Sequence, residues 1–136
     1  MKKIIIFGAS ASGRAAYMML KKEYEIVGFS DNDQKKWGTL FCDVEVFDPL
    51  ELPRLVKEGI QIIIASVYYT AINKQLISMG ITNNKLFYYL GNCMDQKYTG
   101  VYEMITLSAE DIFDCCEYSE DHAKKIASDF LLNYQE

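Results

Sequence analysis

The chain has 136 residues, half of them hydrophobic, and a formal net charge of −5. A chain of this length folds as a single domain around one core and buries roughly two-thirds of the surface that its unfolded form exposes. The negative balance gives no general attraction to nucleic acid or to an anionic membrane, so a bound phosphate has to be held locally.

The lengths of the apolar runs argue against a membrane span, and the spacing of the reactive side chains argues against a metal site and a Cys–His nucleophile pair. The runs at residues 4–7 and 60–65 are far shorter than the roughly 20 residues that span a bilayer, and no cleavage-site pattern follows the N-terminus. We therefore expect a cytoplasmic protein with no membrane span. No metal site and no Cys–His nucleophile pair is predicted, because the reactive residues lack CxxC spacing and include a single histidine: Cys42, Cys93, Cys115, Cys116 and His122.

The first half of the chain alternates short apolar runs with helical segments. Residues 3–7 are predicted to form a strand buried on both faces, because the run is continuous in β-branched and aromatic side chains. A loop of small residues follows, and then an amphipathic helix over 14–23 with Lys21 and Lys22 in its last turn. We expect the second and third strands over 25–30 and 44–47, and a loop or an edge segment over 38–43.

The alternation continues to about residue 90. Asp48 and Pro49 favour the start of a helix that ends at Gly59. Residues 60–66 are the most apolar run and are expected to form a strand near the centre of the sheet. A helix over 69–79 and a strand over 85–89 follow, and two further helices open at Ser108 and Ser119.

These elements predict an α/β fold: a Rossmann-like, doubly wound parallel sheet in three αβα layers, with about five strands and two C-terminal helices. Residues 1–90 are expected to form a nucleotide-binding core. Residues 91–136 are expected to form a helical extension packed on that core or on a partner subunit. The apolar stripe of the last helix fits the chain's own sheet, a second copy, or a larger parent protein.

Residues 7–13, FGASASG, connect the first strand to the first helix. Such a loop brings backbone N–H groups close to a phosphate and aims the N-terminus of a helix at it. The frame Gly8-Ala9-Ser10-Ala11-Ser12-Gly13 matches the GxGxxG fingerprint except at Ser10, which replaces the middle glycine. Its side chain narrows the approach of a pyrophosphate, and its hydroxyl can donate to a phosphate oxygen. Arg14 can reach back over the phosphate; the alternative is an exposed arginine.

Asp31 ends the second strand, 18 residues past Gly13. A carboxylate near this spacing meets ribose hydroxyls, and its charge repels a 2′-phosphate, which favours NAD or a plain nucleotide over NADP. Lys35 and Lys36 weaken that preference, and an ordinary strand-end turn is the alternative. Ser66, Val67 and Tyr68, in the loop after the fourth strand, are expected to line the far wall. Tyr68 or Tyr69 could stack on a base or sugar, or either could be a core or rim residue. The predicted cofactor-binding residues are Gly8, Ala9, Ser10, Ser12, Gly13, Arg14, Asp31, Asn32, Ser66 and Tyr68.

The strings IIIFGASASG, VGFSDND and IIIAS resemble the small Rossmann-like domains of bacterial polysaccharide and glycan biosynthesis proteins. These include the N-terminal domain of PglD-type sugar acetyltransferases and the nucleotide-binding part of nucleoside-diphosphate-sugar epimerase/dehydratases. The resemblance covers about residues 2–90 and implies that Gly8, Ser10, Gly13, Asp31 and Asn32 bind NAD(H) or a nucleotide sugar. The chain departs from these families at the middle glycine, in having no hexapeptide repeat, and in lacking their helix-borne Tyr-x-x-x-Lys motif at the expected place.

The resulting expectation is a domain that binds a nucleotide or nucleotide sugar, either NAD(H) or a UDP-sugar, in sugar-nucleotide or polysaccharide biosynthesis. No complete catalytic constellation is visible, so the catalytic residues and the question of enzymatic activity stay open. One alternative is an NAD-dependent sugar-nucleotide dehydrogenase or epimerase completed by dimerisation. Another is a CoA-binding protein, since CoA-binding proteins of this fold also begin the loop with GAS. The sequence does not name the sugar, the base or the oligomeric state.

Overall fold

A computed structural model describes residues 1–90 and 101–107 of the chain. The strands of these residues are β1 (Lys2–Phe7), β2 (Tyr24–Ser30), β3 (Leu40–Phe41), β4 (Val44–Phe47), β5 (Gln61–Ile64), β6 (Lys85–Leu90) and β7 (Val101–Thr106). Their α-helices are α1 (Ala11–Leu20), α2 (Leu52–Lys57) and α3 (Tyr69–Ser78), and short 3₁₀ turns cover Gln34–Lys36 and Pro49–Glu51.

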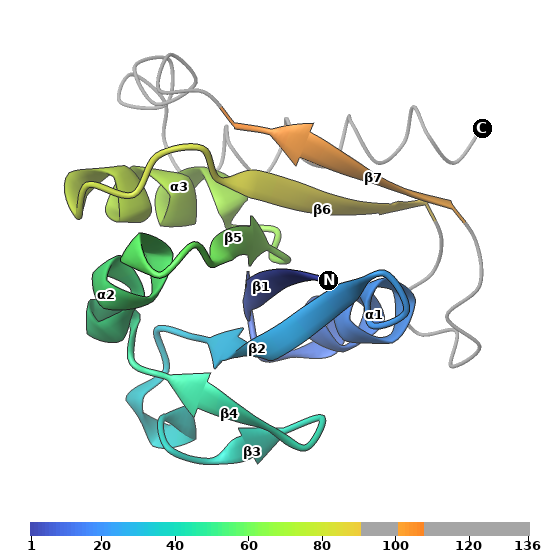
Figure 1. Ribbon diagram of the computed structural model, residues 1–136, viewed down its shortest axis with the longest axis horizontal. Helices are drawn as coiled ribbons and strands as arrows, with labels where there is room; N and C mark the ends of the chain where they lie inside the picture. The colour runs from blue at the N-terminus through green and yellow to red at the C-terminus, as the bar shows by residue number, and fades with distance from the viewer. Residues whose placement is uncertain (91–100, 108–136) are drawn as a thin grey trace.

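The strands form one sheet in the order β3-β4-β2-β1-β5-β6-β7 (Figure 1). The five inner strands are parallel to one another, and the two edge strands, β3 and β7, run antiparallel to the strands beside them. From β1 the chain first builds outward through β2 and β4, and it then crosses back to place β5 on the other side of β1. The strand order therefore reverses between β1 and β5, and this is where the doubly wound fold binds its ligands.

Helices cover both faces of the sheet, with α1 on one face and α2 and α3 on the other (Figure 1). The alternation of side chains along β1 explains the two layers, because Ile4 and Ile6 face α1 whereas Ile5 and Phe7 face α2 and α3. All four side chains are at most 1% exposed, so β1 is buried on both faces, as the sequence predicts.

The α/β Rossmann-like fold is confirmed, but residues 1–90 and 101–107 already contribute seven strands to the sheet, where the sequence predicts about five. One added strand is β3, so residues 38–43 contain an edge strand, the second of the two possibilities that the sequence left open. The other is β7, which pairs with β6 along its whole length inside the segment expected to be a helical extension. The helices predicted from Ser108 and Ser119, and the dimer contact expected through them, lie outside the described residues.

The first helix differs from its prediction at both ends. It begins at Ala11, three residues early, so Ser12 and Gly13 belong to its first turn. It ends at Leu20, and Lys21 and Lys22 lie beyond it and not in its last turn. The Lys21 N–H donates to the Tyr17 carbonyl oxygen at 3.0 Å, and a turn then leads into β2. The early start matters for the site, because it places the first-turn amides of α1 within the glycine loop, residues 8–13.

The structure shows no helix in the described residues that is long and apolar enough to cross a membrane.

Candidate functional site

Gly8 and Gly13 let the glycine loop pack against the sheet and against itself. Gly8 follows β1 with a φ of +129°, and a Cβ there would lie 2.4 Å from the carbonyl oxygen of Ala65 after β5. A Cβ on Gly13 would lie 1.7 Å from the Gly8 carbonyl oxygen. No side chain fits at either position, so the backbone of α1 can approach the end of β1 only with glycine at both.

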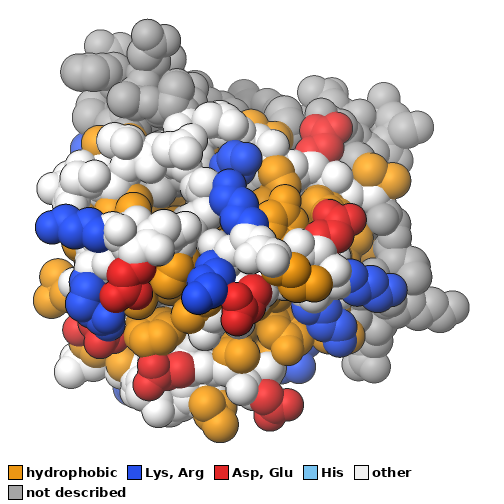
Figure 2. Space-filling view, viewed as in Figure 1, with side chains coloured by type: hydrophobic (Ala, Val, Ile, Leu, Met, Phe, Trp, Pro, Cys, Tyr) orange, Lys and Arg blue, Asp and Glu red, His pale blue; other side chains and the backbone are white. Residues whose placement is uncertain are grey.

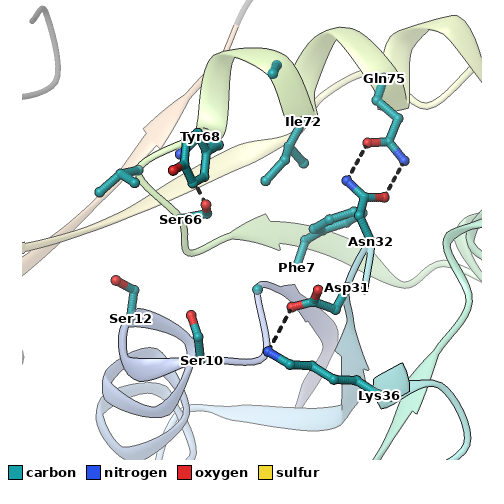
Figure 3. Close-up of a pocket in the computed structure, with 13 residues that line it drawn as sticks. Phe7, Ser10, Ser12, Asp31, Asn32, Lys36, Ser66, Tyr68, Ile72 and Gln75 are labelled. Atoms are coloured by element: carbon teal, nitrogen blue, oxygen red, sulfur yellow. Dashed lines mark hydrogen bonds and ion pairs between the residues drawn. The ribbon is translucent and has the colours of Figure 1, made fainter. Parts of the chain in front are cut away.

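The N-terminus of α1 presents donors to the space above the sheet. Ser10 is the N-cap residue in an extended conformation, and its side chain makes no capping hydrogen bond. The first-turn N–H groups of a helix have no intrahelical partner and carry the positive end of its dipole. Figure 3 shows the Ser10 and Ser12 side chains pointing toward the loop after β5, across a gap. Amides and hydroxyls therefore gather at one corner, the donor set that an anionic oxygen needs.

Asp31 ties the end of β2 to the glycine loop. Its Oδ2 accepts a hydrogen bond of 2.9 Å from the Ala9 N–H, and its Oδ1 accepts one of 2.8 Å from the Asp33 N–H. The Lys36 Nζ lies 3.7 Å from the same Oδ2 and donates to the Ala9 carbonyl oxygen at 2.7 Å (Figure 3). The two peptide groups that flank Ala9 are thus both held by side chains, and the carboxylate faces the glycine loop, as the ribose hypothesis requires.

A cleft of about 430 Å³ lies at the carboxyl ends of β1, β2 and β5. Its near wall comes from the glycine loop and the loop after β2, and its far wall from the loop after β5 and from α3. The Tyr68 N–H donates to the Ser66 Oγ at 3.0 Å, which shapes the start of the far wall. The cleft is lined by Phe7, Gly8, Ser10, Ser12, Asp31, Asn32, Lys36, Ser66, Val67, Tyr68, Ala71, Ile72 and Gln75.

A pair of side-chain amides joins the two walls. The Asn32 Nδ2 donates to the Gln75 Oε1, and the Gln75 Nε2 donates to the Asn32 Oδ1, both at 2.9 Å. Asn32 follows β2 and Gln75 lies on α3, 43 residues later, so the pair links segments that are distant in sequence (Figure 3).

The cleft contains charges of both signs, Asp31 and Lys36, at its β2 end. On the face seen in Figure 2, the side chains of Lys and Arg are interspersed with those of Asp and Glu, with no large area of one sign. Attraction of an anion on this face therefore depends on local donors, as the net charge of the chain also predicts.

Seven of the ten predicted site residues line the cleft: Gly8, Ser10, Ser12, Asp31, Asn32, Ser66 and Tyr68. The other three do not. Ala9 is buried and contributes its peptide group, Gly13 serves the packing of α1, and the Arg14 guanidinium lies 5.0 Å from the centre of the Phe41 ring. Arg14 therefore points to the β3 edge, away from the position over a phosphate that the sequence suggested.

Sequence reasoning missed the contribution of α3. The side chains of Ala71, Ile72 and Gln75 follow Tyr68 at the spacing of one helix face, which is the signal that could have placed them in the cleft. The sequence predicts only an effect of the Lys36 charge, because the contact of its ammonium with the Ala9 carbonyl oxygen depends on the fold.

Among the described residues, the Cys42 thiol lies away from the cleft. No group of three or more His, Cys, Asp or Glu side chains within residues 1–90 and 101–107 could hold a metal ion. Cys42 is in the tight turn between β3 and β4, and burial raises the pKa of its thiol. Cys93, Cys115, Cys116 and His122 lie outside the described residues.

In the comparison with protein families, a model described as C2185-like, N-terminal, matches residues 1–87, well over half of the chain. No curated protein matches the chain.

Among solved structures, the chain is similar to UDP-D-quinovosamine 4-dehydrogenase from Vibrio fischeri, with 25% identity and a TM-score of 0.60 over 82% of this chain and 97% of that one. It is also similar to RSP, a Rex-family repressor, with 17% identity, a TM-score of 0.54 and coverage of 98% of this chain and 62% of the repressor. RSP in complex with β-NADH gives a TM-score of 0.52 at 17% identity. The chain spans less than two-thirds of the repressor's length, and these likenesses support the Rossmann-like fold.

Proposed function

The chain belongs to the C2185-like, N-terminal family, and we propose that it binds a nucleotide or a nucleotide sugar in the cleft above β1 and β5. The proposal rests on the observation that three features lie at the same place. The reversal of strand order, the first-turn amides of α1 and the carboxylate of Asp31 all meet at this cleft. Its volume of about 430 Å³ lies within the range of ligand pockets, roughly 300–1,000 Å³.

The phosphate groups of the ligand bind at the N-terminus of α1. The first-turn amides and the hydroxyls of Ser10 and Ser12 supply hydrogen bonds to phosphate oxygens. Lys36 brings the positive charge among the described lining residues, and the interactions of its ammonium with Asp31 and with the Ala9 carbonyl oxygen leave its third proton for the ligand.

The ribose binds beside Asp31. The Asp31 Oδ2 faces both the Ala9 N–H and the Lys36 ammonium. Within the described residues the Oδ1 accepts only the Asp33 N–H, and it keeps a second lone pair for a sugar hydroxyl. The charge of Asp31 disfavours a 2′-phosphate, while the neighbouring Lys36 reduces that effect. We accordingly place NAD(H) ahead of NADP(H) as a dinucleotide ligand.

A role in sugar-nucleotide or polysaccharide biosynthesis is supported by two observations. The first is the likeness to the Vibrio fischeri enzyme, whose name specifies a UDP-sugar substrate and which the chain covers almost completely. The second is the resemblance of the glycine loop and of the VGFSDND string to domains of that metabolism. A UDP-sugar is therefore the ligand that we test first.

The same likeness favours a second candidate function, dehydrogenation of a UDP-sugar with NAD as the hydride acceptor. In this case the cleft has to hold both compounds, or a second copy of the chain has to complete the site.

Calorimetric titration of the purified chain with UDP-sugars, NAD, NADP and CoA tests the proposal. We expect binding of a UDP-sugar or NAD, weakened by Asp31→Asn and unchanged by Asp43→Asn, because Asp43 is exposed in the turn between β3 and β4. Absence of heat with every compound contradicts the proposal, and binding of CoA alone moves the assignment to a CoA-binding protein.

Absorbance at 340 nm separates a binding domain from a dehydrogenase. NADH formed from NAD and a UDP-sugar supports the second candidate, and it is expected to disappear with Asp31→Asn. Binding of the UDP-sugar without any rise in absorbance supports a binding domain.

A further inference from the structure

The Asn32–Gln75 pair spans the cleft at the end opposite the α1 N-terminus. Figure 3 shows the two planar amides facing each other between the loop after β2 and α3, while Ser10 and Ser12 lie at the other end. Both residues line the cleft. A ligand whose phosphates bind at α1 and whose ribose binds at Asp31 extends its base toward Asn32, the next residue along the chain.

The chemistry of the pair matches that of a nucleobase edge. Each amide offers one N–H donor and one carbonyl acceptor side by side in a plane, and each satisfies both groups on the other amide. A base edge carries the same adjacent donor and acceptor, which is why Asn and Gln bind bases through two hydrogen bonds at once. One amide can therefore exchange its protein partner for a base and keep the same number of hydrogen bonds.

The surroundings supply the apolar contact that a flat ring needs. Ile72 lies one turn before Gln75 on α3 and lines the cleft next to the pair (Figure 3), and the exposed Ala71 precedes it. A base placed there has aliphatic neighbours beside the polar edge, with the buried Phe7 ring beneath them.

The pair also opens at little cost. Asn32 is exposed and Gln75 is half-buried, so water replaces either partner when the amides separate. Hydrogen bonds between exposed side chains contribute little net stability, because the unpaired groups are hydrated instead.

We propose that Asn32 and Gln75 form the base-recognition element of the cleft: their reciprocal pair opens when a nucleotide binds, and the freed amides bind the edge of the base. This inference rests on the proposed nucleotide-binding function and deepens it, because it assigns a role to Gln75 and a place to the base.

Calorimetry with UMP, AMP and ribose 5-phosphate tests the assignment on wild type, Asn32→Ala and Gln75→Met. Ribose 5-phosphate carries the sugar and a phosphate without the base. We expect each variant to bind the preferred nucleotide about 3- to 10-fold more weakly than wild type and to bind ribose 5-phosphate equally well. Comparison of UMP with AMP identifies the base. Gln34→Met is the matched control, because Gln34 is an exposed amide near Asn32 that does not line the cleft.

The outcomes separate the two proposals. Unchanged nucleotide affinity in both variants overturns the base-recognition role and leaves the nucleotide-binding function standing. An equal loss for nucleotides and for ribose 5-phosphate also overturns it, since the pair then acts on the shape of the cleft. Failure of the wild type to bind any of the three compounds, or any UDP-sugar or dinucleotide, removes both proposals.

Discussion

Substitution of Gly13 by alanine tests how closely the glycine loop approaches α1. The added Cβ would lie 1.7 Å from the Gly8 carbonyl oxygen and 3.3 Å from the Phe29 ring. Intrinsic helix propensity favours alanine over glycine by about 1 kcal/mol, so propensity alone predicts stabilisation. The close approach predicts the opposite sign.

The size of the effect follows from what has to move. The Cβ and the carbonyl oxygen both belong to the main-chain framework, so α1 has to shift away from β1 by more than an ångström to relieve the contact. Ala15, Ala16 and Leu20 are fully buried on the same helix, and that shift opens their packing as well. Overpacking costs typically about 1–3 kcal/mol, and we expect a loss at the upper end, about 3 kcal/mol. For a chain of this size the Tm falls by about 10 °C.

Thermal and urea unfolding of wild type, Gly13→Ala and Gly59→Ala measure the loss. Gly59→Ala is the comparison without a clash, because a Cβ at Gly59 meets nothing within 4 Å. Its φ of +94° adds the cost of a left-handed alanine, about 1–2 kcal/mol, which Gly13 in helix α1 does not bear, so a larger loss for Gly13→Ala reports the close approach. A Tm of Gly13→Ala equal to or above that of wild type refutes the packing argument.

Three further substitutions test local features. The pKa of Tyr102 is raised above its ordinary value of 10.0, mainly by burial and secondly by the Glu23 carboxylate, which accepts a hydrogen bond from the Tyr102 hydroxyl. As the pH rises above 10.0, the Tyr102 phenol therefore ionises more readily in the unfolded chain than in the folded one, and the free energy of unfolding falls. We expect the free energy of unfolding of Tyr102→Phe, measured with urea, to fall less than that of wild type between about pH 8 and pH 11. Asp43 has a φ of +64°, so Asp43→Gly is expected to raise the free energy of unfolding by about 0.5–1 kcal/mol, and a fall in Tm contradicts this. The Asp48 Oδ1 accepts the Leu50 N–H at 2.9 Å, so Asp48→Ala is expected to cost about 1 kcal/mol in the same assay, and an unchanged value means that the cap is dispensable.

Features governed by neighbouring residues could be predicted from the sequence. The burial of β1 follows from four consecutive apolar side chains, and the glycine loop follows from small residues between a strand and a helix. Asp31 could be placed beside that loop because parallel strands end at one edge of the sheet.

Features that depend on partners distant in sequence could not be predicted. The strand β7 is stabilised by pairing with β6 across a stretch without a clear period, and its own side chains alternate too weakly to reveal it. The contact between Asn32 and Gln75 depends on how α3 packs against the sheet. The guanidinium of Arg14 lies over Phe41 because the hairpin of β3 and β4 folds back beside α1, an arrangement that the loop motif does not contain.

The hydrogen bonds that Asp31 and Lys36 make to the backbone of Ala9 have a consequence for ligand affinity. Because the protein's own Asp31 and Lys36 side chains fix the backbone N–H and carbonyl oxygen of Ala9, the anion-binding corner is preorganised, and little backbone entropy remains to be lost on association. Forms with and without a nucleotide should therefore superpose closely over residues 8–13, and the side chains that adjust should lie elsewhere in the cleft.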